Sequence, residues 1–184
     1  MIARILRLIT LSTAFLASPV AAQDIVAEDV LEVGENPVIS AQAGDLSLVH
    51  LWTTDPEGFL AAWGRETPPT LSSTLRTVRN VPIQQFILYA NCEQDDEGHC
   101  HLRARVEITA HDGTPYADPM IFDALPKGAP VVERDHIGMA PVSIGIRVED
   151  DEQIGTYTVE LALTDVHAGT TARHAVEIEV SEAP

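Results

Sequence analysis

The sequence predicts an all-β fold, namely an antiparallel, immunoglobulin-like β-sandwich of about eight strands with one short helix. Three observations support this prediction. Short segments of alternating apolar and polar residues are separated by turn signals rich in Gly, Pro, Asn and Asp. Strands and helices do not alternate regularly, as they would in a doubly wound sheet. The only two cysteines, Cys92 and Cys100, have a spacing that suits a disulfide-closed hairpin.

The first 22 residues have the pattern of a secretory signal peptide. Arg4 and Arg7 supply positive charge, residues 5–16 are mostly apolar, and residues 20–22 are small, so we expect cleavage before Gln23. The alternative is an uncleaved membrane anchor, but the apolar run is shorter than the ~20 residues of a spanning helix. We therefore expect a periplasmic or secreted protein with no membrane insertion after leader cleavage.

Length and charge limit the classes of protein. Removing 22 of the 184 residues leaves 162, enough for one domain, which we expect as an N-terminal segment at 23–45 and a β-sandwich domain at 46–184. The remaining chain has 9 Lys and Arg against 28 Asp and Glu, a net charge of −19. This sign argues against nucleic acid and anionic lipid as partners, because both attract basic surfaces.

A short helix is expected near residue 56. Asp55 is a suitable N-cap and Pro56 a suitable first residue, while Phe59, Leu60 and Trp63 follow at helical spacing. Residues 116–130 lead into a Pro- and Gly-rich connection and are expected to be irregular. Outside the central hairpin, strands are expected at 30–33, 46–52, 71–78, 142–148, 156–163 and 173–180.

The central hairpin is predicted in residue detail. If Cys92 faces Cys100 across two antiparallel strands, an apolar face follows. The expected pairs on that face are Ala90 with Leu102, Leu88 with Ala104 and Phe86 with Val106. Ile87 and Tyr89 then form an exposed apolar pair on the other face, where we expect a partner to bind.

Metal-ligating side chains occur beside this hairpin and farther along the chain. His99 and His101 flank Cys100 and follow three acidic residues, but a disulfide removes the thiolates as ligands and leaves a two-histidine surface site as the alternative. Met120, His136 and Met139 carry the donor types of exported copper carriers, although methionine also fills gaps in cores.

Calcium binding and catalysis have weaker support in the sequence. The acidic runs 93–97 and 149–152 lack the spacing of a calcium loop and are expected to be solvated turns. No nucleophile elbow, zinc-binding histidine pair or phosphate loop occurs, so we expect no enzyme and no cofactor. His50 and His174 are expected as hydrogen-bonded structural histidines.

Two sets of motifs resemble known proteins. The segment from Gly155-Thr156-Tyr157 through Thr164-Asp165 to Val176-Glu177-Ile178 is similar to the closing strand pair of immunoglobulin-like and PKD-type domains. Together with Pro56-Glu57-Gly58-Phe59, the Cys92 to Cys100 segment and Asp112-Gly113-Thr114-Pro115-Tyr116, it resembles a functionally uncharacterised family of small exported proteobacterial proteins. The resemblance implies a fold and a compartment and supplies no catalytic residue.

These observations favour a non-enzymatic, exported immunoglobulin-like module that binds a protein or an envelope component. The first alternative is a periplasmic copper-binding or carrier protein that uses His99, His101, His136 or Met139. The second is a carbohydrate-binding module whose aromatic surface contains Trp52 and Trp63. The sequence leaves the oligomeric state open.

Overall fold

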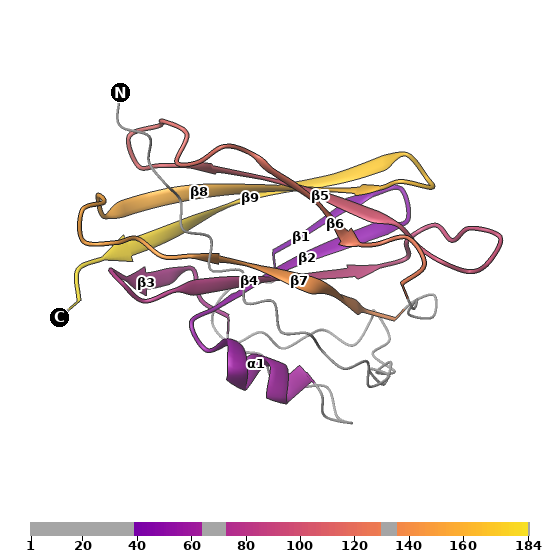
Figure 1. Cartoon of the computed structure of the whole chain (residues 1–184), viewed down its shortest axis with the longest axis horizontal. Helices are drawn as coiled ribbons and strands as arrows, with labels where there is room; N and C mark the ends of the chain where they lie inside the picture. The colour runs from indigo at the N-terminus through magenta and orange to yellow at the C-terminus, as the bar shows by residue number, and fades with distance from the viewer. Residues whose placement is uncertain (1–38, 64–72, 130–135, 184) are drawn as a thin grey trace.

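The computed structural model describes residues 39–63, 73–129 and 136–183, which form two packed β-sheets (Figure 1). The strand order is β1-β2-β4-β7 in the four-stranded sheet and β3-β9-β8-β5-β6 in the five-stranded sheet. The elements are β1 (Ile39–Ala43), β2 (Leu46–Thr53), α1 (Pro56–Trp63), β3 (Arg76–Val78), β4 (Ile83–Ala90), β5 (Leu102–Thr109), β6 (Met120–Leu125), β7 (Gly138–Ile146), β8 (Gly155–Asp165) and β9 (Thr170–Ser181).

The predicted fold class is confirmed. The pairings between these strands are antiparallel, with the exception of the short parallel pair formed by β3 and β9. The two sheets enclose one apolar core, to which β5 contributes alternate residues, among them Leu102, Ala104 and Val106. Alternation of this kind is what a strand shows when one face meets the core and the other meets water.

The predicted central hairpin is wrong, although its two cysteines are bonded. β4 pairs with β2 and β7 in one sheet, whereas β5 pairs with β6 and β8 in the other. Ala90 therefore lies opposite Ser47 and not opposite Leu102. The expected pairs Leu88 with Ala104 and Phe86 with Val106 do not form either, because the chain crosses between the sheets through the loop that the disulfide closes.

The prediction failed because β4 is buried on both faces. Ile87 and Tyr89 point into the core between the sheets, while Phe86 and Leu88 belong to a second apolar cluster on the outer side of the four-stranded sheet. Ile87 and Tyr89 are 0% and 3% exposed, so the partner-binding surface expected at these two residues does not exist. Alternate residues of a strand lie on opposite faces of the sheet. When both sets are apolar, the sequence does not show which set faces the core and which faces the outer side.

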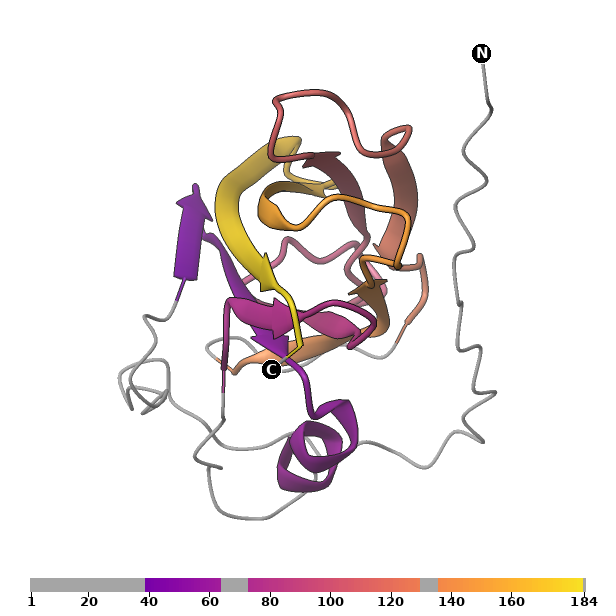
Figure 2. The same cartoon turned by 90° about the vertical axis from the view of Figure 1, so that its left-hand side faces the viewer.

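Helix α1 covers part of the outer side of the four-stranded sheet (Figure 2). It begins as predicted, since the Asp55 carboxylate accepts a hydrogen bond from the Gly58 amide over 3.0 Å. Phe59 and Trp63 are buried against Phe86, with the Phe59 and Phe86 rings stacked 4.2 Å apart, whereas Leu60 faces outward at 38% exposed. The second cluster thus fixes the helix by apolar packing.

The outer face of the five-stranded sheet has the opposite character. Opposite charges pair across neighbouring strands, as between Arg76 and Glu179 at 3.0 Å and between Arg103 and Asp123 at 3.3 Å. Such exposed pairs add little stability, about 0 to 1 kcal/mol each. They keep this face hydrated, so the sandwich has one charged and one apolar outer side.

Several expected elements are found and others differ. The strands expected at 46–52, 142–148, 156–163 and 173–180 correspond to β2, β7, β8 and β9. Strand β1 lies in the segment 23–45, and β6 lies in the stretch expected to be irregular, where Met120 and Phe122 nevertheless pack on the core. The strand expected at 30–33 and the beginning of the one at 71–78 fall outside the described residues. No helix in the described part of the chain has the length and apolarity needed to cross a membrane.

Candidate functional site

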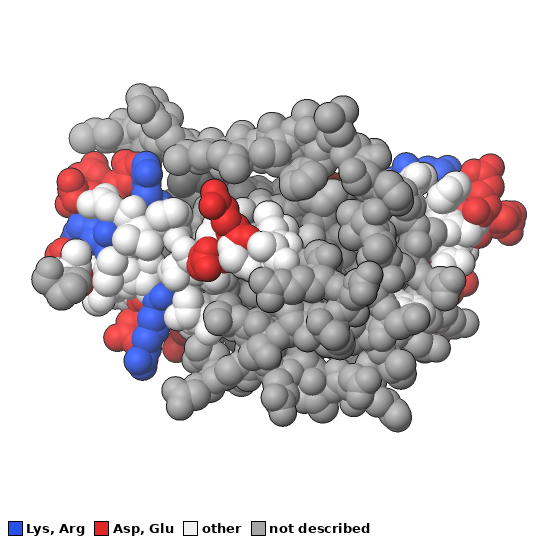
Figure 3. All heavy atoms as spheres, turned by 90° about the horizontal axis from the view of Figure 1, so that it is seen from below, with Lys and Arg blue, Asp and Glu red and all other residues white. Residues whose placement is uncertain are grey.

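One end of the sandwich brings His99 and His101, which the sequence singled out, together with several carboxylates and one further histidine. It is formed by the loop between β4 and β5, the turn between β8 and β9, and the last residues of β6. When the molecule is viewed from the side of α1, acidic and basic side chains are seen both at this end and at the opposite end of the sandwich (Figure 3). We call it the histidine end and define it by Asp95, Glu97, His99, His101, Asp123 and His167.

The disulfide predicted between Cys92 and Cys100 is present and closes the β4–β5 loop, with the two Cα atoms 6.0 Å apart. Cys100 is fully buried and belongs to the core between the sheets. The loop begins at Asn91, which adopts a positive φ of 59°, a conformation that Asn tolerates better than most residues. The loop is therefore held at its base by a covalent bond and by core packing.

Asp165, which is 1% exposed, holds the loop to the β8–β9 turn. One of its carboxylate oxygens accepts a hydrogen bond from the Glu93 amide at 2.6 Å. The other accepts from the amides of His167 and Ala168 at 3.0 and 3.1 Å. Hydrogen bonds from backbone amides to an ionised carboxylate are stronger than neutral ones, so this buried group fixes two loops in one arrangement.

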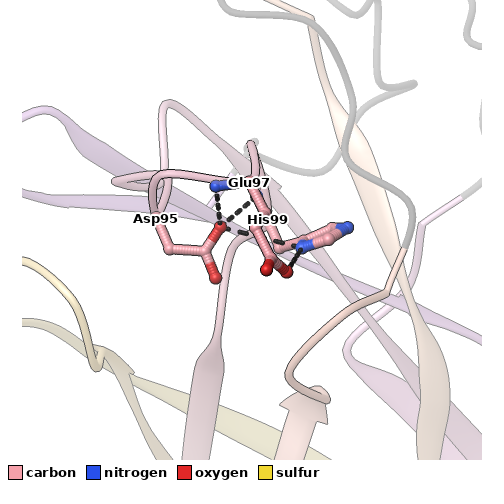
Figure 4. Close-up of side chains that lie close together, drawn as sticks. All are labelled: Asp95, Glu97 and His99. Carbon is pink, nitrogen blue, oxygen red and sulfur yellow. Dashed lines mark hydrogen bonds and ion pairs between the residues drawn. The ribbon is translucent and has the colours of Figure 1, made fainter.

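Asp95, Glu97 and His99 come together at the tip of the loop (Figure 4). The His99 Nδ1 atom lies 3.7 Å from an Asp95 carboxylate oxygen and 3.6 Å from one of Glu97. Asp95 also accepts hydrogen bonds from the amides of His99 and Glu97, and these bonds lower the pKa of its carboxyl, the His99 amide most. One ligand atom from each residue lies within 4.8 Å of the others, so the three side chains are close enough to share a metal ion.

His101 lies on the outer side of the same end and is paired differently. Its Nε2 atom is 3.1 Å from an Asp123 oxygen, to which Arg103 also donates a hydrogen bond at 3.3 Å. The His101 contact is the main reason that the pKa of Asp123 is lowered. The His167 ring lies 6.3 Å from the His101 ring, edge to face. Sequence reasoning named His99 and His101 but missed Asp123 on β6 and His167 in the β8–β9 turn, which lie far from them in the sequence.

The structure does not bring the other predicted metal ligands into one site. Met139 packs in the second apolar cluster, outside the four-stranded sheet, whereas Met120 packs on the core between the sheets. His136 lies just before β7 and does not belong to the group of three His, Cys, Asp or Glu ligands found among the described residues. Met120 and Met139 therefore do not share a site, and each fills space in an apolar cluster, as the sequence analysis allowed.

The expected aromatic surface is also absent, because Trp52 is 0% exposed in the core and Trp63 is 6% exposed on the side of α1 that faces the sheet. The two indole rings belong to different clusters on opposite sides of the four-stranded sheet. Neither ring is available to stack on a sugar, so the carbohydrate-binding surface expected from these residues does not form.

The acidic turn at 149–152 is bound by the side chain of Arg79. Arg79 Nη1 donates to the carbonyl oxygens of Glu149, Asp150 and Glu152 over 2.6 to 3.0 Å, and the same guanidinium binds the Glu182 carboxylate. These interactions with Glu182 raise the pKa of Arg79 further. The sequence analysis expected a solvated turn here and did not foresee that Arg79 organises it.

Two histidines lie away from this end, inside the sandwich. His50 on β2 is 3% exposed, and its ring meets the His174 ring of β9 with centroids 5.5 Å apart. Gln85 on β4 bonds to His50 Nδ1 at 3.1 Å. Burial, and secondarily the proximity of His174, lower the pKa of His50 from 6.5 to about 3. The imidazole is therefore neutral at physiological pH.

Comparison with known proteins gives a fold likeness and no family. No model of a protein family matches the chain, and no curated protein shows significant sequence similarity to it. The likeness to exported proteobacterial proteins therefore stays a prediction, whereas the β-sandwich is established by the structure.

Three solved structures with similar folds differ widely in what they are. One is the CARDB domain of a Pyrococcus furiosus protein in complex with di-metal ions, with 12% identity over 59% of this chain and 86% of that one and a TM-score of 0.34. Another is a family 123 glycoside hydrolase from Clostridium perfringens, with 11% identity, 74% and 28% coverage and a TM-score of 0.40. The third is a Niemann-Pick type C2 protein from Japanese carpenter ant, with 6% identity, 81% and 98% coverage and a TM-score of 0.38. Similarity this low supports no conclusion about what this chain does.

Proposed function

We propose that the protein is a non-enzymatic, exported binding module that contacts a protein or an envelope component through its histidine end. The observation that supports this proposal is the double fixation of the β4–β5 loop, by the Cys92–Cys100 disulfide and by Asp165. Besides stabilising the fold, this fixation preorganises the loop for binding, which lowers the cost of association.

The composition of this end indicates the kind of partner. Asp95, Glu97 and Asp123 give it acidic character, and His99 and His101 add imidazole nitrogens that form hydrogen bonds. A basic or hydrogen-bonding surface on a protein or envelope polymer is the complementary partner. Location outside the cytoplasm is supported by the leader pattern and by the disulfide, which oxidising compartments maintain.

The experiment is site-specific photocrosslinking in intact cells of a native host. A photoreactive residue replaces Glu97 at the histidine end or, as the matched control, Glu177 on the charged outer face of β9. The proposal expects a reproducible adduct from position 97 only, which weakens when Asp165→Asn loosens the loop. Equal adducts from both positions, or none from position 97, would contradict it.

A second candidate function, metal binding, is favoured by one observation, the convergence of Asp95, Glu97 and His99 within 4.8 Å. Two carboxylates and one imidazole suit a borderline divalent ion such as Zn²⁺ better than Cu(I). Calorimetric titration with ZnCl₂ tests this candidate against His99→Ala and against His111→Ala, a control histidine in the loop after β5. If the two variants bind Zn²⁺ equally well, the β4–β5 loop is not the zinc site.

A further inference from the structure

The outer face of the five-stranded sheet lies on the side of the sandwich opposite α1 (Figure 2), and its charges are sorted along the strands. The register of the sheet aligns the outward residues of neighbouring strands in rows. The two rows nearest the histidine end form what we call the basic half, whose charged residues are Arg103, Arg105, Arg173 and Asp123. The next three rows form the acidic half, whose charged residues are Glu107, Glu160, Glu177, Glu179 and Arg76.

The two halves have opposite net charges. Three arginines and one aspartate give the basic half a net charge of +2, although the whole chain has a net charge of −17. Four glutamates and one arginine give the acidic half a net charge of −3. The arginines form exposed ion pairs within the chain, as Arg173 does with Glu160 at 3.6 Å. Because exposed pairs of this kind contribute little stability, they can be exchanged for pairs with another molecule at little cost.

The basic half also presents apolar surface. Ile121 is 62% exposed and lies opposite Arg105 across the β5–β6 pair. Ala162 points outward between Arg105 and Arg173, yet it is only 4% exposed, so neighbouring side chains cover it. The aliphatic parts of arginine side chains cover apolar surface in this way. Arginine combined with apolar groups is typical of surfaces that bind proteins.

The order of charges along this face specifies the pattern that a partner needs. The partner has to place negative charge over the basic half and positive charge over the neighbouring acidic half. A second copy of this chain has that pattern when it is related to the first by a two-fold axis that runs across the strands. The strands of the two facing sheets then stay nearly aligned, which is a common way for sheets to pack.

The size of the face indicates how strongly two copies associate. Outward rows are about 6.8 Å apart and strands about 4.8 Å apart, so five rows on five strands cover roughly 27 Å by 19 Å. This is on the order of 500 Å² per copy, below the ~800 Å² per partner of a standard stable complex. Charges farther apart than about 8 Å are largely screened at physiological ionic strength, so the contacts between the halves outweigh the repulsion between distant acidic groups. A weak, reversible dimer is the expected result.

We propose that two copies of this chain associate through the outer faces of their five-stranded sheets, each basic half lying over the acidic half of the other copy. The two histidine ends then point in opposite directions, because the two-fold axis reverses the direction of the strands. This inference goes beyond the proposed function, since the dimer forms whether or not the histidine end binds another molecule. A dimer with two such ends gains avidity for a repetitive partner.

The experiment measures self-association of the purified protein by sedimentation velocity in about 150 mM NaCl, from about 10 µM to about 1 mM protein. Wild type is expected to pass from monomer to dimer over this range. Arg105→Glu/Arg173→Glu makes both halves negative, and Glu160→Arg/Glu177→Arg makes both halves positive. Each double variant is expected to weaken self-association by about tenfold or more, because like charges then face each other.

A matched control and a mixing experiment separate this contact from an effect of total charge. Lys127→Glu/Arg147→Glu changes the net charge as much as Arg105→Glu/Arg173→Glu does, but outside the face, and should dimerise as wild type does. An equimolar mixture of the two face variants should form a heterodimer, because one has two negative halves and the other two positive halves. Circular dichroism should show that all variants keep the wild-type fold, since the substituted side chains are exposed.

Three outcomes would each overturn the proposal: a monomeric wild type at about 1 mM, equal self-association of wild type and both face variants, or a mixture of the face variants that stays monomeric. Binding of a polyanion to the basic half of a monomeric wild type would instead assign that half to a different partner. In the photocrosslinking experiment, an adduct at position 177 with a second copy has twice the mass of the chain, which distinguishes it from an adduct with another molecule.

Discussion

Burial of His50 makes the stability of the protein sensitive to acid. In the folded protein the pKa of this imidazole is about 3, below its ordinary value of 6.5, mainly because burial disfavours the charged form. Between these two pH values the unfolded chain binds a proton at His50 and the folded chain does not. The stabilising contribution is therefore fully present above pH 6.5 and is lost progressively as the pH falls toward 3.

The expected loss follows from these two values. Lowering the pH from 7.5 to 5.0 protonates His50 in the unfolded chain only, which costs about 2 kcal/mol of unfolding free energy. This figure hardly depends on the folded-state pKa as long as that value stays below 4. Carboxyls with lowered pKa values, such as Asp95 and Asp123, also destabilise the fold in acid, so a variant lacking His50 is needed to isolate its contribution.

Urea unfolding of chelator-treated protein, followed by circular dichroism at both pH values, measures this contribution. The loss of unfolding free energy on acidification is expected to be about 2 kcal/mol smaller in His50→Leu than in wild type. His111→Ala, which removes a histidine from an exposed turn, serves as the control and should keep the wild-type loss. Equal losses in His50→Leu and wild type would refute the reasoning, because His50 would then titrate alike in both states.

Three further changes test the loop, the helix and the disulfide. Asp165→Asn should cost about 2 kcal/mol, since the amide cannot accept all three backbone hydrogen bonds, and hydrogen exchange should speed up at the Glu93 amide. Phe59→Ala should cost about 3 kcal/mol by removing a ring packed on Phe86, whereas Leu60→Ala should cost less than about 0.5 kcal/mol in denaturant unfolding. Cys92→Ser should lower the unfolding free energy by about 2.5 kcal/mol through loop entropy, and an unchanged melting temperature would contradict that estimate.

The all-β sandwich was predictable because most of its strands have one wet face. β8 and β9 alternate cleanly, and their pairing places Val159 opposite Val176 on the inward side. The pattern of β4 was ambiguous, because the run from Phe86 to Ala90 is apolar at both parities. Two cysteines eight residues apart fit a hairpin and a crossover between sheets equally well, since a disulfide limits Cα distance and not hydrogen bonding.

The candidate sites were predictable only where their residues are neighbours in sequence. Asp95, Glu97 and His99 lie within five residues, so their convergence could be read from the chain. Asp165 could not be assigned a role, because its partner Glu93 lies 72 residues away. His50 and His174 come from different sheets. The one sequence signal that predicted their inward orientation is that each lies at the alternate positions that are apolar in its strand.

The guanidinium of Arg79 makes the shape of the 149–152 turn independent of bound calcium. In many extracellular folds an acidic turn is closed by a dissociable divalent ion, and removing that ion opens the turn. Here the Arg79 guanidinium binds three backbone carbonyls instead. Because it is part of the chain, it does not dissociate on dilution and a chelator cannot remove it. The end of the sandwich farthest from the disulfide therefore keeps its shape whatever the local supply of calcium.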